Sequence, residues 1–197
     1  NNVISELVIQ NGTSTNVNDF NYENGGGVLV YSSSVDFERV TIESSSGIVG
    51  GGIYFNASTS NLNEVVISNN QAISGGGIYS EGSNLLISNS QISDNAAIRL
   101  SSNYTEYPFL NEVGGGLYID IFSNVVIGSS EINTNSSRKG SGAFIQNDSN
   151  LDLYNVIANG NTHSSELTTT DFEGLALFVQ NSNINMVNVD FSNHSGN

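Results

Sequence analysis

The sequence predicts an all-β protein, specifically a parallel β-helix (β-solenoid) of about seven coils with roughly 25 residues in each. Three observations predict this fold. Glycine-led segments recur, and the first three open at Gly25, Gly50 and Gly75. Apolar side chains fall into two columns with the same period, and the intervening residues are rich in Asn, Ser and β-branched side chains. Such a unit is too short for a propeller blade and lacks the helix of a leucine-rich repeat.

The composition excludes several classes of function. The 197 residues include 19 Asp plus Glu but only 4 Lys plus Arg, giving a net charge of −15, so nucleic acid and anionic lipid are poor partners. No apolar run approaches the roughly 18 residues that a membrane span needs. The chain has no Cys and only two His, His163 and His194, so we expect no disulfide framework, no metal centre and no cofactor.

The first element of each repeat is a strand that follows a glycine-rich turn. These segments begin at Gly25, Gly50, Gly75, Gly114, Gly140 and Gly174. The wider spacing of the later segments predicts insertions near 99–112 and 162–173 within a single domain over 1–197. Glycine is expected at these positions because a tight corner leaves no room for a Cβ atom.

Alternation within the glycine-led strand separates a core-facing set from an outward-facing set. The outward set is an aromatic stripe, made of Tyr54, Tyr79, Tyr118, Phe144 and Phe178. Two interpretations remain open. The rings either stabilise the stacking of successive coils, with or without a covering loop, or form a lateral contact surface for a partner, another subunit or a sugar. A slip of one residue would turn the rings inward.

The other elements of the repeat carry the two apolar columns. One column comprises Ile9, Ile42, Ile67, Ile92, Ile132, Ala158 and Phe191, and the column five residues earlier comprises Ile4, Phe37, Leu62, Ile87, Ile127, Leu153 and Met186. Three residues after the first column lies a small polar position, which is Asn in four repeats: Asn70, Asn95, Asn135 and Asn161. Because Asn tolerates a left-handed backbone and its amide can bond its neighbours, we expect an asparagine ladder at a turn.

One segment supports a family resemblance. The sequence ISNNQAISGGGIY, from Ile67 to Tyr79, resembles the paired FxxN and GGA(I/L/V) repeats of the chlamydial polymorphic outer-membrane proteins and of related β-helical secreted proteins. The resemblance recurs along most of the chain, with Ile in most Phe positions and Gly in place of Ala. It implies a right-handed parallel β-helix on a cell surface, often adhesive. It implies no catalytic residue, because both motifs are structural.

Possible glycosylation sites point to an extracellular location. The six N-x-S/T sequons are Asn11, Asn56, Asn103, Asn135, Asn147 and Asn193. Asn56 and Asn103 are the best candidates for N-linked glycans, whereas Asn135 also occupies a ladder position, where an inward-pointing side chain would be inaccessible. The alternative for each is an ordinary turn residue. We expect a protein that is secreted or displayed at the cell surface.

The sequence begins partway through one repeat and stops partway through another, and no signal peptide opens it. We therefore expect a mature product, a window of a longer chain or a fibre subunit. Uncapped end coils expose unpaired backbone groups, and head-to-tail stacking of such units would produce a filament. The expected partner is therefore another copy of the chain, in head-to-tail or lateral assembly.

The sequence lacks a convincing catalytic constellation. Its few cations do not suit lyase chemistry on uronates, and both histidines occupy polar loop or end positions. The carboxylate pairs Asp148 with Asp152 and Asp36 with Glu38 are more typical of turns and solvated faces. We expect a non-enzymatic structural element of a glycosylated fibre or coat. The alternatives are an adhesin passenger of the polymorphic-membrane-protein type and a polysaccharide-active enzyme.

Overall fold

The computed structural model describes residues 2–14, 24–99, 111–163 and 173–195. These residues form strands and turns, and they contain no helix. Every strand pairing among them is parallel, which confirms the predicted all-β class and its parallel strands. No described segment is a helix of sufficient length and hydrophobicity to span a bilayer.

Three sheets make up the structure. The front sheet contains β3 (Val28–Tyr31), β6 (Ile53–Asn56), β10 (Ile78–Glu81), β14 (Leu117–Asp120), β18 (Ala143–Ile145) and β21 (Leu177–Val179), which lie in sequence order from one edge to the other. The small sheet contains β9 (Gln71–Ala72), β13 (Ala96–Ala97), β17 (Ser136–Ser137) and β20 (Thr162–His163).

The large sheet has 12 strands in two arms. One arm contains β1 (Asn2–Ser5), β4 (Val35–Glu38), β7 (Thr59–Asn63), β11 (Asn84–Ser88) and β15 (Asn124–Gly128). The other contains β2 (Val8–Gln10), β5 (Thr41–Glu43), β8 (Val66–Ser68), β12 (Gln91–Ser93) and β16 (Glu131–Asn133). The longer β19 (Asn150–Asn159) joins the arms, and β22 (Asn183–Ser192) pairs with β19.

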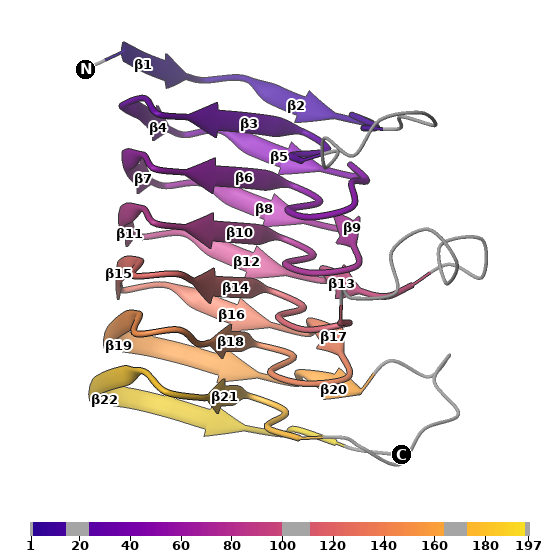
Figure 1. Ribbon diagram of the computed structural model, residues 1–197, viewed down its shortest axis with the longest axis vertical. Helices are drawn as coiled ribbons and strands as arrows, with labels where there is room; N and C mark the ends of the chain where they lie inside the picture. Colours follow the sequence, from indigo (N-terminus) through magenta and orange to yellow (C-terminus); the bar gives the residue numbers. More distant parts are fainter. Residues whose placement is uncertain (1, 15–23, 100–110, 164–172, 196–197) are drawn as a thin grey trace.

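Successive repeats form layers that follow one another along the long axis of the molecule (Figure 1). Each strand pairs with the equivalent strand of the preceding and following repeat, as β10 does with β6 and β14. The insertion after β13 does not disturb this order, because β12 still pairs in register with β16. The predicted insertions near 99–112 and 162–173 lie mostly outside the described residues.

The predicted apolar columns are confirmed by the strand register. Ile42, Ile67, Ile92 and Ile132 face one another across adjacent strands, and all four are buried. The second column is likewise in register, from Ile4 in β1 to Met186 in β22. Apart from their last residues, Met186 and Phe191, both columns contribute to one hydrophobic core enclosed by the front and large sheets. Met186 is 47% exposed because no further strand of the described chain covers it.

Left-handed backbone conformations mark the corners between strands. Gly50 and Gly75 have φ values of 63° and 65°, and a Cβ atom on Gly50 would lie 2.5 Å from the Ile53 carbonyl oxygen. This explains why glycine opens the front-sheet strands. The ladder asparagines differ from our expectation, since the left-handed residue is the one before each: Asn69 precedes Asn70, for example, and has φ 56°. The ladder position is selected for its side-chain hydrogen bonds, not for its φ angle.

A serine ladder that the sequence analysis missed lies at another corner. The Oγ of Ser83 accepts a hydrogen bond from the Ser58 backbone N–H at 3.0 Å, and the Oγ of Ser123 accepts one from the Ser83 N–H at 3.1 Å. Ser149 continues the ladder. All four side chains are buried. Serine therefore supplies internal acceptors at a corner where the backbone N–H would otherwise lack one.

Candidate functional site

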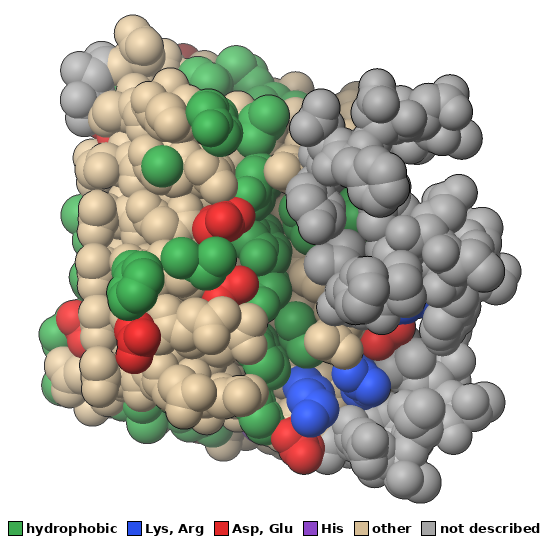
Figure 2. Space-filling model, viewed as in Figure 1, with side chains coloured by type: hydrophobic (Ala, Val, Ile, Leu, Met, Phe, Trp, Pro, Cys, Tyr) green, Lys and Arg blue, Asp and Glu red, His purple; other side chains and the backbone are tan. Residues whose placement is uncertain are grey.

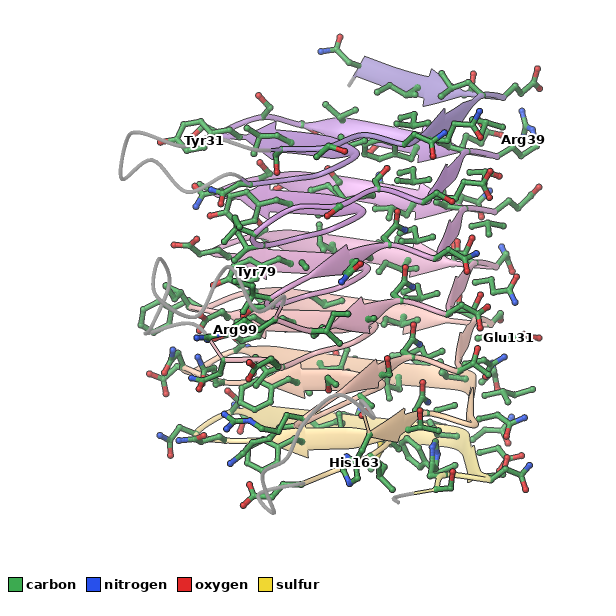
Figure 3. The ribbon with its side chains drawn as sticks, turned by 90° about the vertical axis from the view of Figure 1, so that its right-hand side faces the viewer. Tyr31, Arg39, Tyr79, Arg99, Glu131 and His163 are labelled. Atoms are coloured by element: carbon green, nitrogen blue, oxygen red, sulfur yellow. The ribbon has the colours of Figure 1, made fainter. Side chains whose placement is uncertain are left out.

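The aromatic stripe is continuous along the front sheet. Neighbouring rings lie 5.2 Å (Tyr54 and Tyr79), 4.6 Å (Tyr79 and Tyr118), 5.4 Å (Tyr118 and Phe144) and 4.9 Å (Phe144 and Phe178) apart between centroids. Figure 2 shows apolar side chains as a column on this face, and in Figure 3 Tyr79 projects on the side opposite Arg39 and Glu131. The rings point away from the main core, as their parity predicts.

A second apolar layer covers most of the stripe. Tyr54 is 5% exposed and packs with Ile48, Val49 and Ile73, which precede the glycine turns. Tyr118 and Phe144 are also buried and cluster with Val113. Of the two interpretations left open by the sequence, this burial favours a role in stacking the repeats over a broad lateral contact surface.

The buried tyrosines surround a buried carboxylate. Asp120 is 5% exposed, and its Oδ2 accepts hydrogen bonds from the Tyr118 hydroxyl at 2.9 Å and the Tyr79 hydroxyl at 3.1 Å. Its Oδ1 accepts bonds from the Ile121 backbone N–H at 2.9 Å and the Asn147 amide at 2.7 Å. The Tyr54 hydroxyl bonds in the same way to the carboxylate of Glu81. We call Tyr54, Tyr79, Tyr118, Glu81 and Asp120 the phenol–carboxylate cluster.

Hydrogen bonds engage the polar atoms of this cluster. Each phenol is a donor to a carboxylate, and Asp120 already accepts bonds at both oxygens. A general base needs a free lone pair facing a substrate, and a nucleophile needs an adjacent base with an open approach. The cluster therefore fixes the outer side of the front sheet and ties β10 to β14.

The cluster predicts a loss of stability in alkali. Burial, followed by contact with the neighbouring carboxylates and phenols, raises the pKa of Tyr54, Tyr79 and Tyr118 well above 10. A raised folded-state pKa means that these phenols stabilise the fold fully below the unfolded value near 10, and that this contribution declines as pH rises above it. We expect tyrosinate absorbance at 295 nm to show three tyrosines that ionise only when circular dichroism reports unfolding. Ordinary ionisation of all tyrosines near pH 10 in the folded protein would contradict this prediction.

An ion cluster lies beside the aromatic stripe. Glu112, buried next to Val113, pairs with Arg99 at 3.1 Å and lies 3.8 Å from the Nε of Arg138. Lys139 pairs with Glu173 at 3.0 Å, and its ammonium lies 5.5 Å from the centroid of the Phe178 ring. Arg138 and Lys139 therefore each lie beside a carboxylate of a neighbouring segment. Glu112 links the two flanks of the 100–110 segment to the next repeat.

The predicted ladder residues form a continuous column of buried amides. The Oδ1 of Asn95 accepts hydrogen bonds from the backbone N–H and the amide of Asn70, both at 3.0 Å, and the Asn95 amide donates to the Ile67 carbonyl at 2.9 Å. Asn135 and Asn161 repeat this geometry. Ser45 precedes the four amides, and the Nδ1 of His194 follows them, accepting the Asn161 N–H at 3.2 Å.

The ladder corrects one predicted glycosylation site. Asn135 has no exposed surface, and its amide nitrogen donates to the Ile92 carbonyl and to Asn161 Oδ1, so a glycan has no room in the folded protein. Asn56 is half-buried and donates to the Tyr54 hydroxyl, and Asn147 donates to the buried Asp120. Asn11 and Asn193 are exposed. Asn103 lies outside the described residues.

These environments predict which sequons carry sugar in chain secreted by eukaryotic cells. We expect a glycan at Asn11, where the side chain is exposed, and none at Asn135 in folded material, because the ladder excludes it. Peptide mass spectrometry after enzymatic deglycosylation in heavy-oxygen water reads each position separately. A Thr13→Ala variant, which removes the Asn11 sequon, is the matched control. Sugar at Asn135 in soluble, folded protein would contradict the prediction.

The side chains considered for catalysis either lie on different elements or already have hydrogen-bond or ion-pair partners. Asp36 accepts hydrogen bonds from the Asn61 backbone and amide, and Glu38 pairs with Arg39. Asp148 is an exposed corner residue, whereas Asp152 lies within β19. His163 lies in the small sheet, where burial lowers its pKa. No group of three His, Asp or Glu that could hold a metal occurs in the described ranges.

Comparison with protein-family models, with curated proteins and with solved structures finds no match. The resemblance to the polymorphic outer-membrane proteins therefore stays a prediction. What the geometry defines is a class: an all-β repeat protein whose parallel strands are tied together by ladders of buried polar side chains.

Proposed function

We propose that the chain is a right-handed parallel β-helix that serves as a non-enzymatic structural element of an extracellular, glycosylated fibre or surface coat, in which copies stack end to end. The observation that carries the proposal is the unbroken ladder of buried amides from Asn70 to Asn161. Polar groups that could do chemistry instead join one repeat to the next. Such a network produces a stiff, regular body, which suits a mechanical role.

The outermost strands support end-to-end stacking. In β22 the core-column residues Met186 and Phe191 are 47% and 39% exposed, and at the opposite end Leu7, between β1 and β2, is 40% exposed. The outer edges of these strands have no pairing within the described chain. A second copy placed in parallel would pair both edges and cover these side chains with equivalent ones.

Sedimentation velocity and electron microscopy of the 197-residue chain test the proposal. We expect association that increases with concentration and filaments whose long axis runs along the stack of repeats. Phe191→Lys should abolish this association, because a charge would be buried at the junction. Leu86→Lys is the matched control, since Leu86 is 47% exposed on β11, away from both ends. Monomers with unpaired ends at high concentration would refute the stacking.

A further inference from the structure

The corner that follows the arm containing β2 has the same backbone geometry in every repeat, and we call it the outer corner. Its residue is left-handed each time, with φ between 53° and 63°. The backbone N–H of this residue donates to a carbonyl of the next repeat in each of the first six repeats. The outer-corner residues are Asn11, Ser44, Asn69, Asp94, Thr134, Gly160 and Asn193. All except Gly160 are exposed, so this corner presents its side chains to solvent.

Only the first and the last outer-corner residues begin a sequon. These sequons are Asn11–Thr13 and Asn193–Ser195. Of the five residues between them, four are not Asn, and Asn69 has no Ser or Thr two positions later. Asn11 directly follows β2 and Asn193 directly follows β22, which lie in the first and last layers of Figure 1. Two exposed sequons therefore share one corner and lie at opposite ends of the described stack.

Neighbouring side chains at the outer corner can touch. The Thr134 hydroxyl donates to Asp94 Oδ1 at 2.7 Å, although the two residues are 40 positions apart in the sequence. In an end-to-end stack that continues the register of β19 and β22, Asn11 of the next copy would lie beside Asn193 in the same way. The Asn193 N–H would then donate to a carbonyl of that copy, as the Asn11 N–H donates to the Glu43 carbonyl at 3.2 Å within the chain.

Such a junction has room for one glycan but not for two. Glycosylation joins the Asn Nδ2 to the anomeric carbon of an oligosaccharide, breaks the bond from that carbon to its lipid diphosphate carrier, and releases one amide proton. The nitrogen keeps its other hydrogen, so the 3.0 Å bond from the Asn193 amide to Asn159 Oδ1 is compatible with a glycan. Adjacent strands lie only about 4.8 Å apart, so two bulky, branched oligosaccharides on touching side chains would overlap.

We propose that glycans at Asn11 and Asn193 control end-to-end assembly, because a junction between two copies accepts one glycan and is blocked by two. The inference rests on the proposed stacking and identifies its regulation. Copies that carry sugar at both positions remain apart, whereas copies that lack one of the two sugars form a filament with one glycan at each junction. Asn56 and Asn147 lie in interior layers, so glycans there leave the junction open.

Conjugates of defined composition test this control independently of cellular glycosylation. The chain has no Cys, so Asn11→Cys and Asn193→Cys, alone and together, can be coupled to a branched oligosaccharide through an iodoacetamide linker. We expect each single conjugate to form filaments as the bare protein does, and the double conjugate to associate at least about tenfold more weakly in sedimentation velocity. The matched control combines Asn11→Cys with Leu86→Cys, both conjugated, which gives two sugars per chain but one per junction.

The outcomes separate this inference from the proposed function. A double conjugate that associates as strongly as the matched control would overturn the glycan control while stacking stands, whereas bare protein that stays monomeric would refute stacking itself. Uncoupled protein with both Asn11→Cys and Asn193→Cys checks the junction geometry, because cysteines on adjacent strands lie within disulfide reach. Oxidation with diamide should link neighbouring copies into a ladder of covalent oligomers. Filaments that form no such cross-links would contradict the proposed neighbours.

Discussion

Replacement of Gly76 by Ala is expected to lower the free energy of unfolding by at least about 3 kcal/mol. A Cβ atom there would lie 2.5 Å from the carbonyl carbon and oxygen of Ala96 and 2.6 Å from the Gly115 carbonyl oxygen. All these atoms are backbone, so no side-chain rotation can relieve the overlap. The following repeat, which contains Ala96 and Gly115, would have to move away, which disrupts the stacking that defines the fold.

Urea denaturation measures this effect, and Gly128→Ala is its matched control. Gly128 lies at the end of β15, its Cβ would meet no atom closer than the Tyr154 carbonyl oxygen at 3.9 Å, and its φ is not positive. We expect the control to change stability by less than about 1 kcal/mol. Equal stabilities for the two variants would show that the glycine turns are looser than the structure indicates.

Asn95→Ala is expected to lower the free energy of unfolding by about 3–5 kcal/mol, because it leaves several buried polar groups without a hydrogen-bond partner. The Asn70 backbone N–H and amide both lose their acceptor, and the Ile67 carbonyl loses the Asn95 amide. The shortened side chain also leaves a cavity beside Asn135 in a region with no exposed surface. Two neighbouring repeats would be weakened together.

Asn124→Ala is the comparison for this effect. Asn124 belongs to an exposed row of amides, in which it donates to Asn84 at 3.0 Å and accepts from Asn150 at 2.6 Å. Water replaces these partners when the side chain is removed, so we expect a loss of less than about 1 kcal/mol by thermal or urea unfolding. If Asn95→Ala and Asn124→Ala lower the free energy of unfolding equally, burial does not account for the stabilising effect of the asparagine ladder.

The sequence predicts the core well because the repeat period places equivalent side chains directly opposite each other. Ile42, Ile67 and Ile92 share one position of the unit, and the parallel register keeps them aligned. The insertion after Arg99 does not disturb Ile132, since loops leave and return at the same point of the repeat. The need for glycine at the turns follows from the same regularity.

The sequence predicts the outer surface less well. The covering of Tyr54 depends on Ile48, Val49 and Ile73, which fold back from the glycine turns, and strand alternation contains no information about such a layer. The environment of Asp120 also depends on tyrosines up to 41 residues away. A short hydrophobic segment before some of the glycine turns, such as GIVG ending at Gly50, is the signal that could have indicated the second layer.

Other features escaped prediction because single residues decide them. Nothing in the period predicts that Ile121 and Phe122, in the turn between β14 and β15, are exposed and left-handed. The serine ladder was likewise hidden, since Ser is frequent throughout the chain and only the structure separates buried from exposed copies. The Asn135 sequon shows the same ambiguity for Asn.

The distance between spin labels along one column tests the central claim, a stack of parallel repeats, most directly. Asn61, Leu86, Val126, Asp152 and Asn185 are aligned outward positions separated by 25, 40, 26 and 33 residues. The chain has no Cys, so cysteine pairs at 61 and 152 or at 61 and 185 can be labelled cleanly. We expect backbone separations of about 14 Å and about 19 Å, equal steps of roughly 4.8 Å per repeat whatever the number of intervening residues. Distances that grow with the number of residues, or broad distributions, would contradict the stacked arrangement.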